Sequence, residues 1–177
     1  MQITFEKKKD NNQKKSLAIV GGGITGISFT DPVALTESCG IENNLGRRKE
    51  LSSKFIYTAV EKAGGARKFF SNVFLTAIYP FAITNNGINY NYYNDKSLAE
   101  KLKPEIIRTI KSQIEFGARR DVAILLGKKN AEYFSKINAE HKVFDKIIVL
   151  DHPRYIMQYR LKKIDQYITK YLEAINK

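Results

Sequence analysis

The sequence predicts an α/β fold, a three-layer α/β/α sandwich around a short, mainly parallel sheet of four strands. Four short apolar runs are widely spaced along the chain, and segments with helical periodicity lie between them. Strands that alternate with helices are typical of a parallel sheet covered by helices. With 177 residues, 43% of them hydrophobic, the chain can bury one full core as a single domain.

The elements follow in order along the chain. Residues 1–15 are polar and rich in lysine, which predicts a solvated lead-in before a domain over residues 16–177. The apolar runs predict buried strands at residues 17–20, 73–78, 122–126 and 147–150. Helical spacing predicts helices at residues 53–63, 98–116, 131–137 and 159–175, with a break at Pro104 in the second.

The charge balance points to a polyanionic partner. Thirty Lys and Arg against 18 Asp and Glu give a net charge of +12, which fits nucleic acid, although lysine-rich surfaces also serve solubility. The single Cys39 cannot form an internal disulfide, and no Cys or His pairing predicts a metal site. No apolar stretch approaches the length of a membrane span. We expect a monomeric cytoplasmic protein.

A histidine follows the last predicted strand. His152, one of two histidines, stands at the carboxyl end of the strand at 147–150, where open α/β sheets place their ligand crevice. Pro153 stiffens the turn behind it and disfavours a helix at that position. The segment LDHPRYIMQYR at residues 150–160 resembles the His-Pro motif of the uracil-DNA glycosylase superfamily. The full sequence of this segment resembles the bacterial SMUG-like branch of that superfamily, the single-strand-selective monofunctional type. Without the resemblance, a lone histidine after a strand favours a structural role.

A glycine-rich segment follows the first predicted strand and allows two interpretations. Gly21, Gly23 and Gly26 satisfy the GxGxxG spacing of flavin and nicotinamide sites. Such a site requires a helix directly after the glycines. The β-branched and aromatic segment at 27–32, which ends in proline, predicts none. We therefore expect no cofactor.

The same segment, GGGITGISFTDP at residues 21–32, resembles the base-pocket loop of that glycosylase branch. The resemblance implies that Phe29 stacks on a flipped base, with Thr25, Gly26 and Gly23 in the pocket wall. Glycines there let the backbone approach the base closely. An ordinary core position is the alternative interpretation of Phe29.

The resemblance covers about residues 21–175 and implies base-excision repair, in which the bond joining uracil to deoxyribose is hydrolysed. The departing base becomes an anion, and His152 matches the residue that donates a hydrogen bond to it. The family positions a water with an Asn in a Gly-x-Asn-Pro-Gly loop, which this sequence lacks. If the chain excises uracil, Ser16 or Asp31 must hold that water.

Two further departures from the family pattern limit what the resemblance implies. The resemblance leads us to expect a chain shortened at its amino terminus relative to the family, and Ala77 stands where typical SMUG enzymes carry an Asn that contacts the uracil edge. The sequence therefore predicts a glycosylase-like protein with impaired activity. A noncatalytic nucleic-acid-binding module on the same fold is the alternative, and base specificity stays open.

The helix start after His152 combines cations with flat side chains. Arg154, Tyr155, Gln158 and Arg160 are predicted to bind DNA, single- or double-stranded, through phosphates and by wedging into a base stack. The intervening Ile156 and Met157, and Tyr159 after them, fit either this surface or the helix core.

Overall fold

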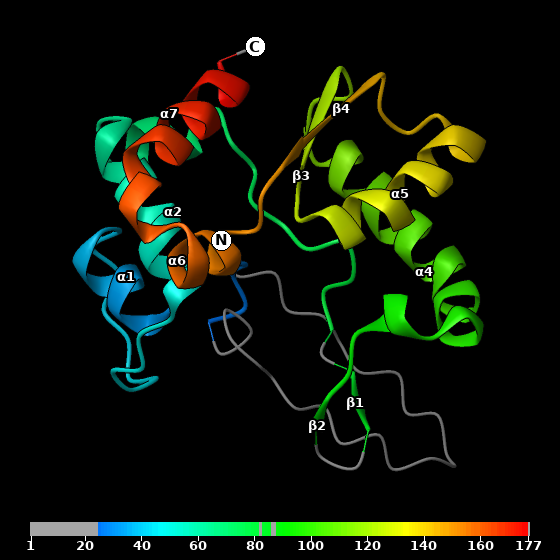
Figure 1. The fold of residues 1–177 in the computed structure, drawn as a ribbon, viewed down its shortest axis with the longest axis horizontal. Coiled ribbons are helices and arrows are strands. Elements are labelled where there is room, and N and C mark those ends of the chain that lie inside the picture. The colour runs from blue at the N-terminus through cyan, green and yellow to red at the C-terminus, as the bar shows by residue number, and fades with distance from the viewer. Residues whose placement is uncertain (1–24, 82, 86–87, 177) are drawn as a thin grey trace.

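The structure is a computed structural model that describes residues 25–81, 83–85 and 88–176. Two parallel strands lie between helices on both sides, so the three layers of the predicted sandwich are present (Figure 1). The predicted lead-in, the strand expected at 17–20, and the glycines at 21–23 lie outside the described residues.

The two strands are β3 (Val122–Leu126) and β4 (Lys146–Leu150). They pair in parallel from Val122 opposite Lys146 to Leu126 opposite Leu150. Helix α5 (Lys128–His141) connects them, as a parallel pair requires. Because side chains alternate across a strand, Leu126 and Leu150 face one core while Leu125 and Ile147 face the other.

The first core lies between the sheet and a layer of helices. Its helices are α1 (Pro32–Glu37), α2 (Leu51–Lys62), α3 (Ala66–Phe70), α6 (Pro153–Tyr159) and α7 (Ile164–Ile175). The apolar stripe of α2 packs against α6 and α7, and Phe55, Ile156 and Ile168 are at most 1% exposed. This burial is what orders the helices, since short helices are marginal alone.

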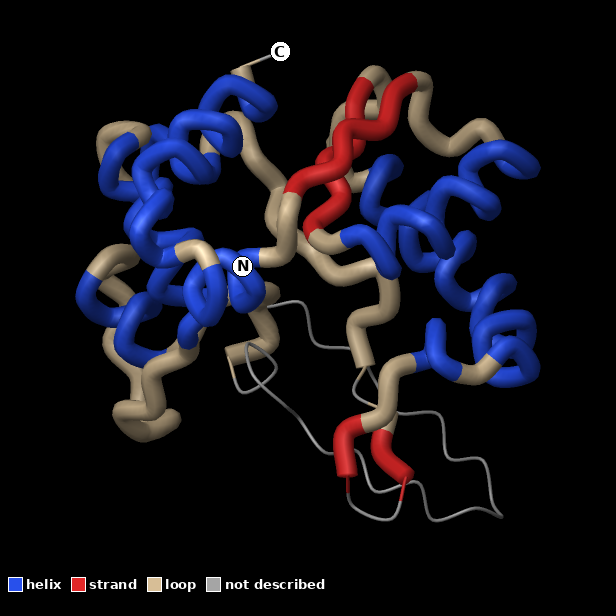
Figure 2. Tube along the Cα trace, in the orientation of Figure 1, coloured by secondary structure: helices blue, strands red, loops and turns tan. Residues whose placement is uncertain are grey.

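The second core lies on the other face of the sheet. It is formed by α4 (Lys96–Glu115) and α5, whose Ile106, Phe134 and Ile137 are at most 2% exposed. Beside it are the short antiparallel strands β1 (Thr84–Asn85) and β2 (Ile88–Asn89) and the 3-10 turn η2 (Tyr92–Asn94), visible in Figure 2.

The prediction of four strands is corrected for the described residues, where the parallel sheet has two. The segment at 73–78, predicted as a strand, runs without a strand partner in the described part of the chain. Its apolar residues are still used, because Val73 and Leu75 pack on the first core while Ile78 packs on the second. An apolar run reports burial, whereas a strand also needs a hydrogen-bonded neighbour.

Helix boundaries differ from the predictions in several places. Helix α6 begins at Pro153, because proline is favoured at the first helical position, where its missing N–H costs nothing. The helix predicted at 159–175 is a 3-10 turn, η3 (Leu161–Lys163), followed by α7. Helix α4 continues through Pro104, which lies on its exposed side. Helix α1, which was not predicted, starts at Pro32.

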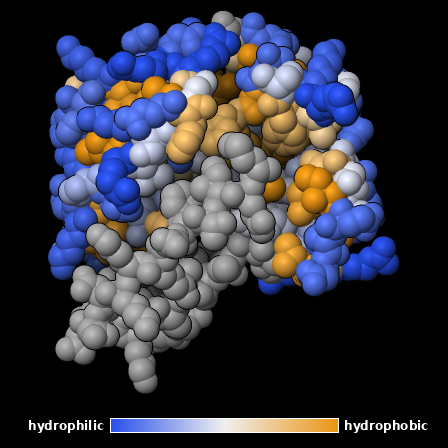
Figure 3. Space-filling view, turned by 180° about the vertical axis from the view of Figure 1, so that it is seen from behind, coloured by the Kyte–Doolittle hydropathy of each residue, from blue (hydrophilic) through white to orange (hydrophobic). Residues whose placement is uncertain are grey.

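Figure 3 shows the molecule from behind, with several apolar patches across the upper part of the face and hydrophilic residues along its edges. Among the described helices, none combines the length and apolar character required to cross a bilayer.

Candidate functional site

His152 occupies the junction between the sheet and the first helical layer. It follows β4 and caps α6, where its Nδ1 accepts a hydrogen bond from the backbone N–H of Arg154 at 3.1 Å. A capping acceptor must be unprotonated, so in the neutral ring the hydrogen is on Nε2. The cap therefore makes His152 a hydrogen-bond donor through Nε2.

The surroundings of His152 favour the same neutral form. Burial of the ring lowers the pKa of His152, and the positive charge of Arg154 lowers it further. At neutral pH the side chain is therefore an uncharged imidazole, which can cap α6 and donate through Nε2 at once.

Phe29, far from His152 in sequence, lies against it in space. The two ring centroids are 5.5 Å apart with planes inclined at 61°, an edge-on contact. Phe29 has a φ of +54°, which is uncommon for a residue with a side chain and turns the ring out of the regular chain path. The structure thus brings together the two residues that the sequence placed in one base pocket.

Hydrogen bonds hold the loop that carries Phe29. The Thr25 hydroxyl donates to the Thr30 carbonyl at 2.7 Å, and the Thr30 and Tyr57 hydroxyls share a bond of 3.0 Å. The Asp31 carboxylate accepts the backbone N–H groups of Ala34 and Glu50, both at 2.8 Å. These bonds fix the loop to the start of α2, so the positive φ of Phe29 is supported by its neighbours.

The predicted pocket-wall residues and the two residues predicted to hold the water differ in their surroundings. Gly26 is exposed with a φ of +73°, while the Thr25 hydroxyl is engaged inside its own loop. Gly23 and Ser16 lie outside the described residues. Asp31 is 4% exposed and both its oxygens accept backbone N–H groups, so it serves the loop rather than a water.

Two residues outside the predicted site adjoin His152. A Cβ on Gly127, directly after β3, would lie 3.3 Å from the His152 Cβ, a tight contact that would push on the His152 side chain. The buried hydroxyl of Tyr171, from α7, donates to the Asp151 carbonyl. A glycine after a strand is visible in the sequence, but these contacts join distant segments and carry no local signal.

Helix α6 presents the predicted DNA-contact residues to solvent. Arg154, Tyr155, Gln158 and Arg160 are exposed, and the Arg160 guanidinium lies 5.3 Å from the centre of the Tyr155 ring. The Tyr155 and Tyr159 rings are 5.5 Å apart.

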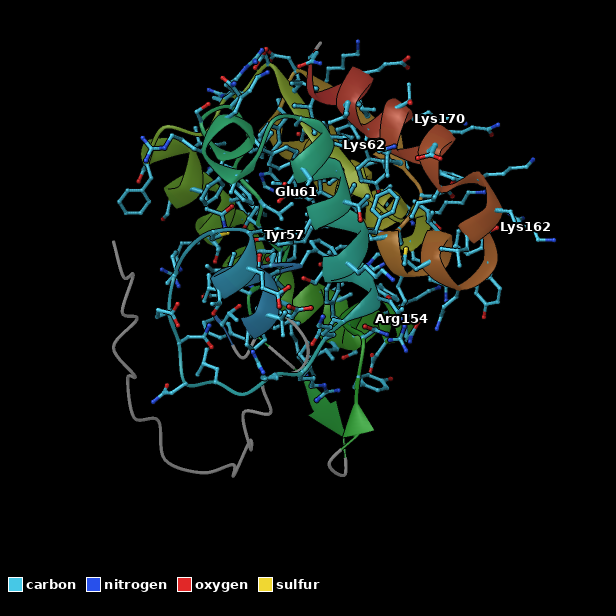
Figure 4. All side chains as sticks on the ribbon, turned by 90° about the vertical axis from the view of Figure 1, so that its left-hand side faces the viewer. Tyr57, Glu61, Lys62, Arg154, Lys162 and Lys170 are labelled. Carbon is cyan, nitrogen blue, oxygen red and sulfur yellow. The ribbon has the colours of Figure 1, made fainter. Side chains whose placement is uncertain are left out.

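The open alternatives on this helix are settled by burial. Tyr159 is 64% exposed and belongs to the surface, whereas Ile156 and Met157 are buried in the first core. Figure 4 shows Arg154 near the amino-terminal end of α2, apart from Lys162 and Lys170.

An acidic residue accompanies Arg154. Burial raises the pKa of the Glu50 carboxyl, and the negative charge of Asp31 adds to this, while Arg48 and Arg154 lower it. Glu50 therefore lies within electrostatic reach of a predicted DNA-binding cation.

Residues 27–31, directly after the glycine-rich segment, form no helix, as the sequence predicts, but an unpredicted helix begins at Pro32. Helix α1 is six residues long and starts six positions after Gly26, capped by the Asp31 side chain. An Asp-Pro pair is a helix-start signal that this prediction overlooked. Among the described residues, no group of three or more His, Cys, Asp or Glu is arranged to hold a metal.

Known proteins of one superfamily are similar to this chain. The family model described as "Uracil DNA glycosylase superfamily" matches residues 11–176. A solved structure of SMUG2 from Pedobacter heparinus is 37% identical, with a TM-score of 0.81 over 88% of this chain and 69% of that chain. No curated protein matches. The predicted glycosylase-like α/β fold is confirmed by these matches.

Proposed function

Because this chain belongs to the uracil-DNA glycosylase superfamily, we propose that it flips uracil, or a related damaged base, out of DNA and hydrolyses its N-glycosidic bond. The observation that carries the proposal is the contact between Phe29 and His152. A flipped base needs an aromatic face and a hydrogen-bond donor within one base width, and these two side chains supply both.

His152 is proposed to stabilise the leaving base. As the glycosidic bond breaks, negative charge develops on a uracil oxygen, and a donor already fixed in place stabilises it without reorganisation. The cap of α6 holds the imidazole with its Nε2 hydrogen available, and the low pKa keeps the ring neutral. The role therefore needs no proton transfer from His152.

DNA is proposed to cross the exposed face of α6. Arg154 and Arg160 can bind phosphates, which contact DNA of any sequence. Tyr155 and Tyr159 offer exposed rings that could fill the space left by a flipped base. Gln158 lies on the same exposed side and can hydrogen-bond to a base edge or to sugar.

Turnover is proposed to be slow relative to binding. The sequence has no Gly-x-Asn-Pro-Gly loop, and Asp31, one of the two alternative water holders, is buried in backbone contacts. A positioned water accelerates hydrolysis because it is already close to the sugar and correctly oriented. Without a residue that holds this water, the chain can still bind uracil-containing DNA but should hydrolyse the bond slowly. Restoring that loop ahead of Gly21 should raise the rate.

The test measures uracil release from a uracil-containing oligonucleotide, followed by alkaline cleavage of abasic sites. We expect weak but measurable release that falls by a further factor of about 10²–10³ in His152→Ala. His141→Ala, at the exposed end of α5, is the matched control and should leave release unchanged. Equal loss in both variants would contradict the role of His152.

A noncatalytic nucleic-acid-binding module is the second candidate, and the missing loop is the observation that favours it. This candidate predicts that the chain binds uracil-containing DNA and releases no uracil at any enzyme concentration. It also predicts no gain when the loop is restored, whereas the enzymatic proposal predicts a gain that His152→Ala removes.

A further inference from the structure

A tyrosine cluster lies on the other side of the sheet from α6, and the proposed function does not use it. In η2, Tyr92 packs 5.0 Å from the Tyr133 ring, and its hydroxyl donates to Asn130 Oδ1 at 3.2 Å. Burial raises the pKa of Tyr92 above its ordinary value. Tyr92 is thus a fixed, neutral anchor for the residue that follows it.

Tyr93 is the accessible member of this cluster. It is half-buried, its ring centroid is 5.3 Å from that of Tyr92, and the Lys129 ammonium lies 5.8 Å from its centre. Lys128 and Lys129 are exposed, and within the described part of the chain neither forms an ion pair. An aromatic ring and uncompensated cations therefore share one small surface.

This surface adjoins the candidate site through the start of α5. Gly127 lies against His152, with its ideal Cβ position 3.4 Å from the His152 Cδ2. Lys129 follows Gly127 by two residues in α5, a rise of about 3 Å along the helix axis. Contacts join Phe29 to His152, His152 to Gly127, and Lys129 to Tyr93, and two steps of the backbone lead from Gly127 to Lys129.

We propose that Tyr93 and Lys129 form a second DNA-contact site, which binds the single-stranded segment next to the nucleotide held at His152. A base of that segment stacks on Tyr93, and Lys129 moves from the ring to a phosphate of the same segment. Aromatic stacking with a nearby cation is the usual chemistry of single-strand binding. The proposal rests on the proposed function only for the nucleotide at His152.

The exchange of Lys129 for a base is favourable on physical grounds. A cation over an exposed ring is weakly held, because water competes for it. Stacking of a base on the same ring is stronger, and a lysine that reaches a phosphate also releases a condensed counterion. Bases in a duplex are already stacked and paired, so the site selects unpaired DNA.

The test compares binding of a single-stranded oligothymidylate of about 10 nucleotides with one central deoxyuridine and of its duplex. Fluorescence anisotropy with Tyr93→Leu should show single-strand affinity weakened by about 5- to 100-fold, while Tyr93→Phe keeps wild-type affinity. Lys129→Ala should lower the salt slope by about 0.7. Lys136→Ala, an exposed lysine later in α5, is the control and should change neither quantity.

A second measurement needs no variant. With 2-aminopurine placed on either side of the deoxyuridine, wild-type protein should quench the fluorescence on at least one side through stacking. Unchanged fluorescence on both sides would overturn the proposal. So would wild-type single-strand affinity in folded Tyr93→Leu and Lys129→Ala, or equal losses for single strand and duplex.

Uracil release separates this proposal from the proposed function. If wild-type protein binds single strands through Tyr93 but releases no uracil, the proposed function fails and the second contact site stands. If uracil is released and Tyr93→Leu leaves KM unchanged, the second site fails and the proposed function stands. A rise in KM with unchanged kcat supports both.

Discussion

The two faces of the sheet differ in what their buried side chains do. The first core, under α2, α6 and α7, contains tyrosines whose hydroxyls reach the site: Tyr57 bonds Thr30 in the Phe29 loop, and Tyr171 bonds Asp151 beside His152. The second core, under α4 and α5, is mainly aliphatic, with Ile106 and Ile137 at its centre. One face positions the site while the other supports the sheet.

The largest expected effect comes from one substitution in each core. Both should lower stability by a similar amount, but only the one in the first core should disturb the candidate site. Ile156→Ala in the first core and Ile106→Ala in the second each remove a side chain that is 0% exposed. Each should lower the free energy of unfolding by about 2–5 kcal/mol, measured by urea denaturation. Because Ile156 anchors α6, only Ile156→Ala should also reduce binding of duplex uracil-containing DNA at temperatures where both variants are folded.

Equal losses of binding in the two folded variants would contradict the division between the faces. Separate unfolding transitions for the two variants would sharpen it, since each core would then be a cooperative unit of its own.

The next effect concerns Gly127, where the two faces meet at His152. Its φ of +100° disfavours any side chain, and a Cβ would press on the His152 ring. Gly127→Ala should therefore cost about 1–3 kcal/mol of stability and displace His152, lowering uracil release in the folded variant. Gly117→Ala has a similar φ of +103° but nothing within 4 Å, so it should lose stability and keep release.

A smaller effect is expected from two tyrosine hydroxyls, one on each face of the sheet. Tyr171 donates to the Asp151 carbonyl on the first face, and Tyr133 donates to the Ala99 carbonyl on the second, at 2.8 Å. Removal of either hydroxyl should cost about 0.5–1.5 kcal/mol of stability. Tyr171→Phe should also lower kcat for uracil release because Asp151 adjoins His152. The comparison fails if Tyr133→Phe lowers kcat as much.

The smallest expected effect is a pH dependence that belongs to His152. Its folded-state pKa lies below the ordinary value of 6.5, so the unfolded chain takes up this proton first as the pH falls. Stability should decrease as the pH falls through 6.5 and level off below the folded-state pKa. His152→Asn, which can still cap α6, should remove this part of the decrease in thermal unfolding, while His141→Asn should retain it.

Much of the scaffold was predictable because it depends on local pattern. The strands predicted at 122–126 and 147–150 and the helices predicted at 53–63 and 98–116 are present as β3, β4, α2 and α4. Alternating strands and helices were enough to indicate the layered α/β fold. The predicted helix boundaries were wrong where one residue is compatible with two structures. Proline disfavours a helix that continues through it, but it is also favoured as a first helical residue, as Pro153 is in α6.

For the candidate site too, the sequence predicted some features and the tertiary structure decided the others. The sequence alone nominated His152 and Phe29, through motifs that resemble a family, and their chemical roles stay predictions. It also determined that α6 carries cations, since charge follows from residue type.

Only the tertiary structure decided that Phe29 meets His152, that Gly127 leaves room for the ring, and that Asp31 is committed to the backbone of its loop. It also decided the tautomer of His152, through a cap that exists only once α6 has formed. Local propensities act over a few residues, whereas these contacts join segments that are brought together only when both faces of the sheet are buried.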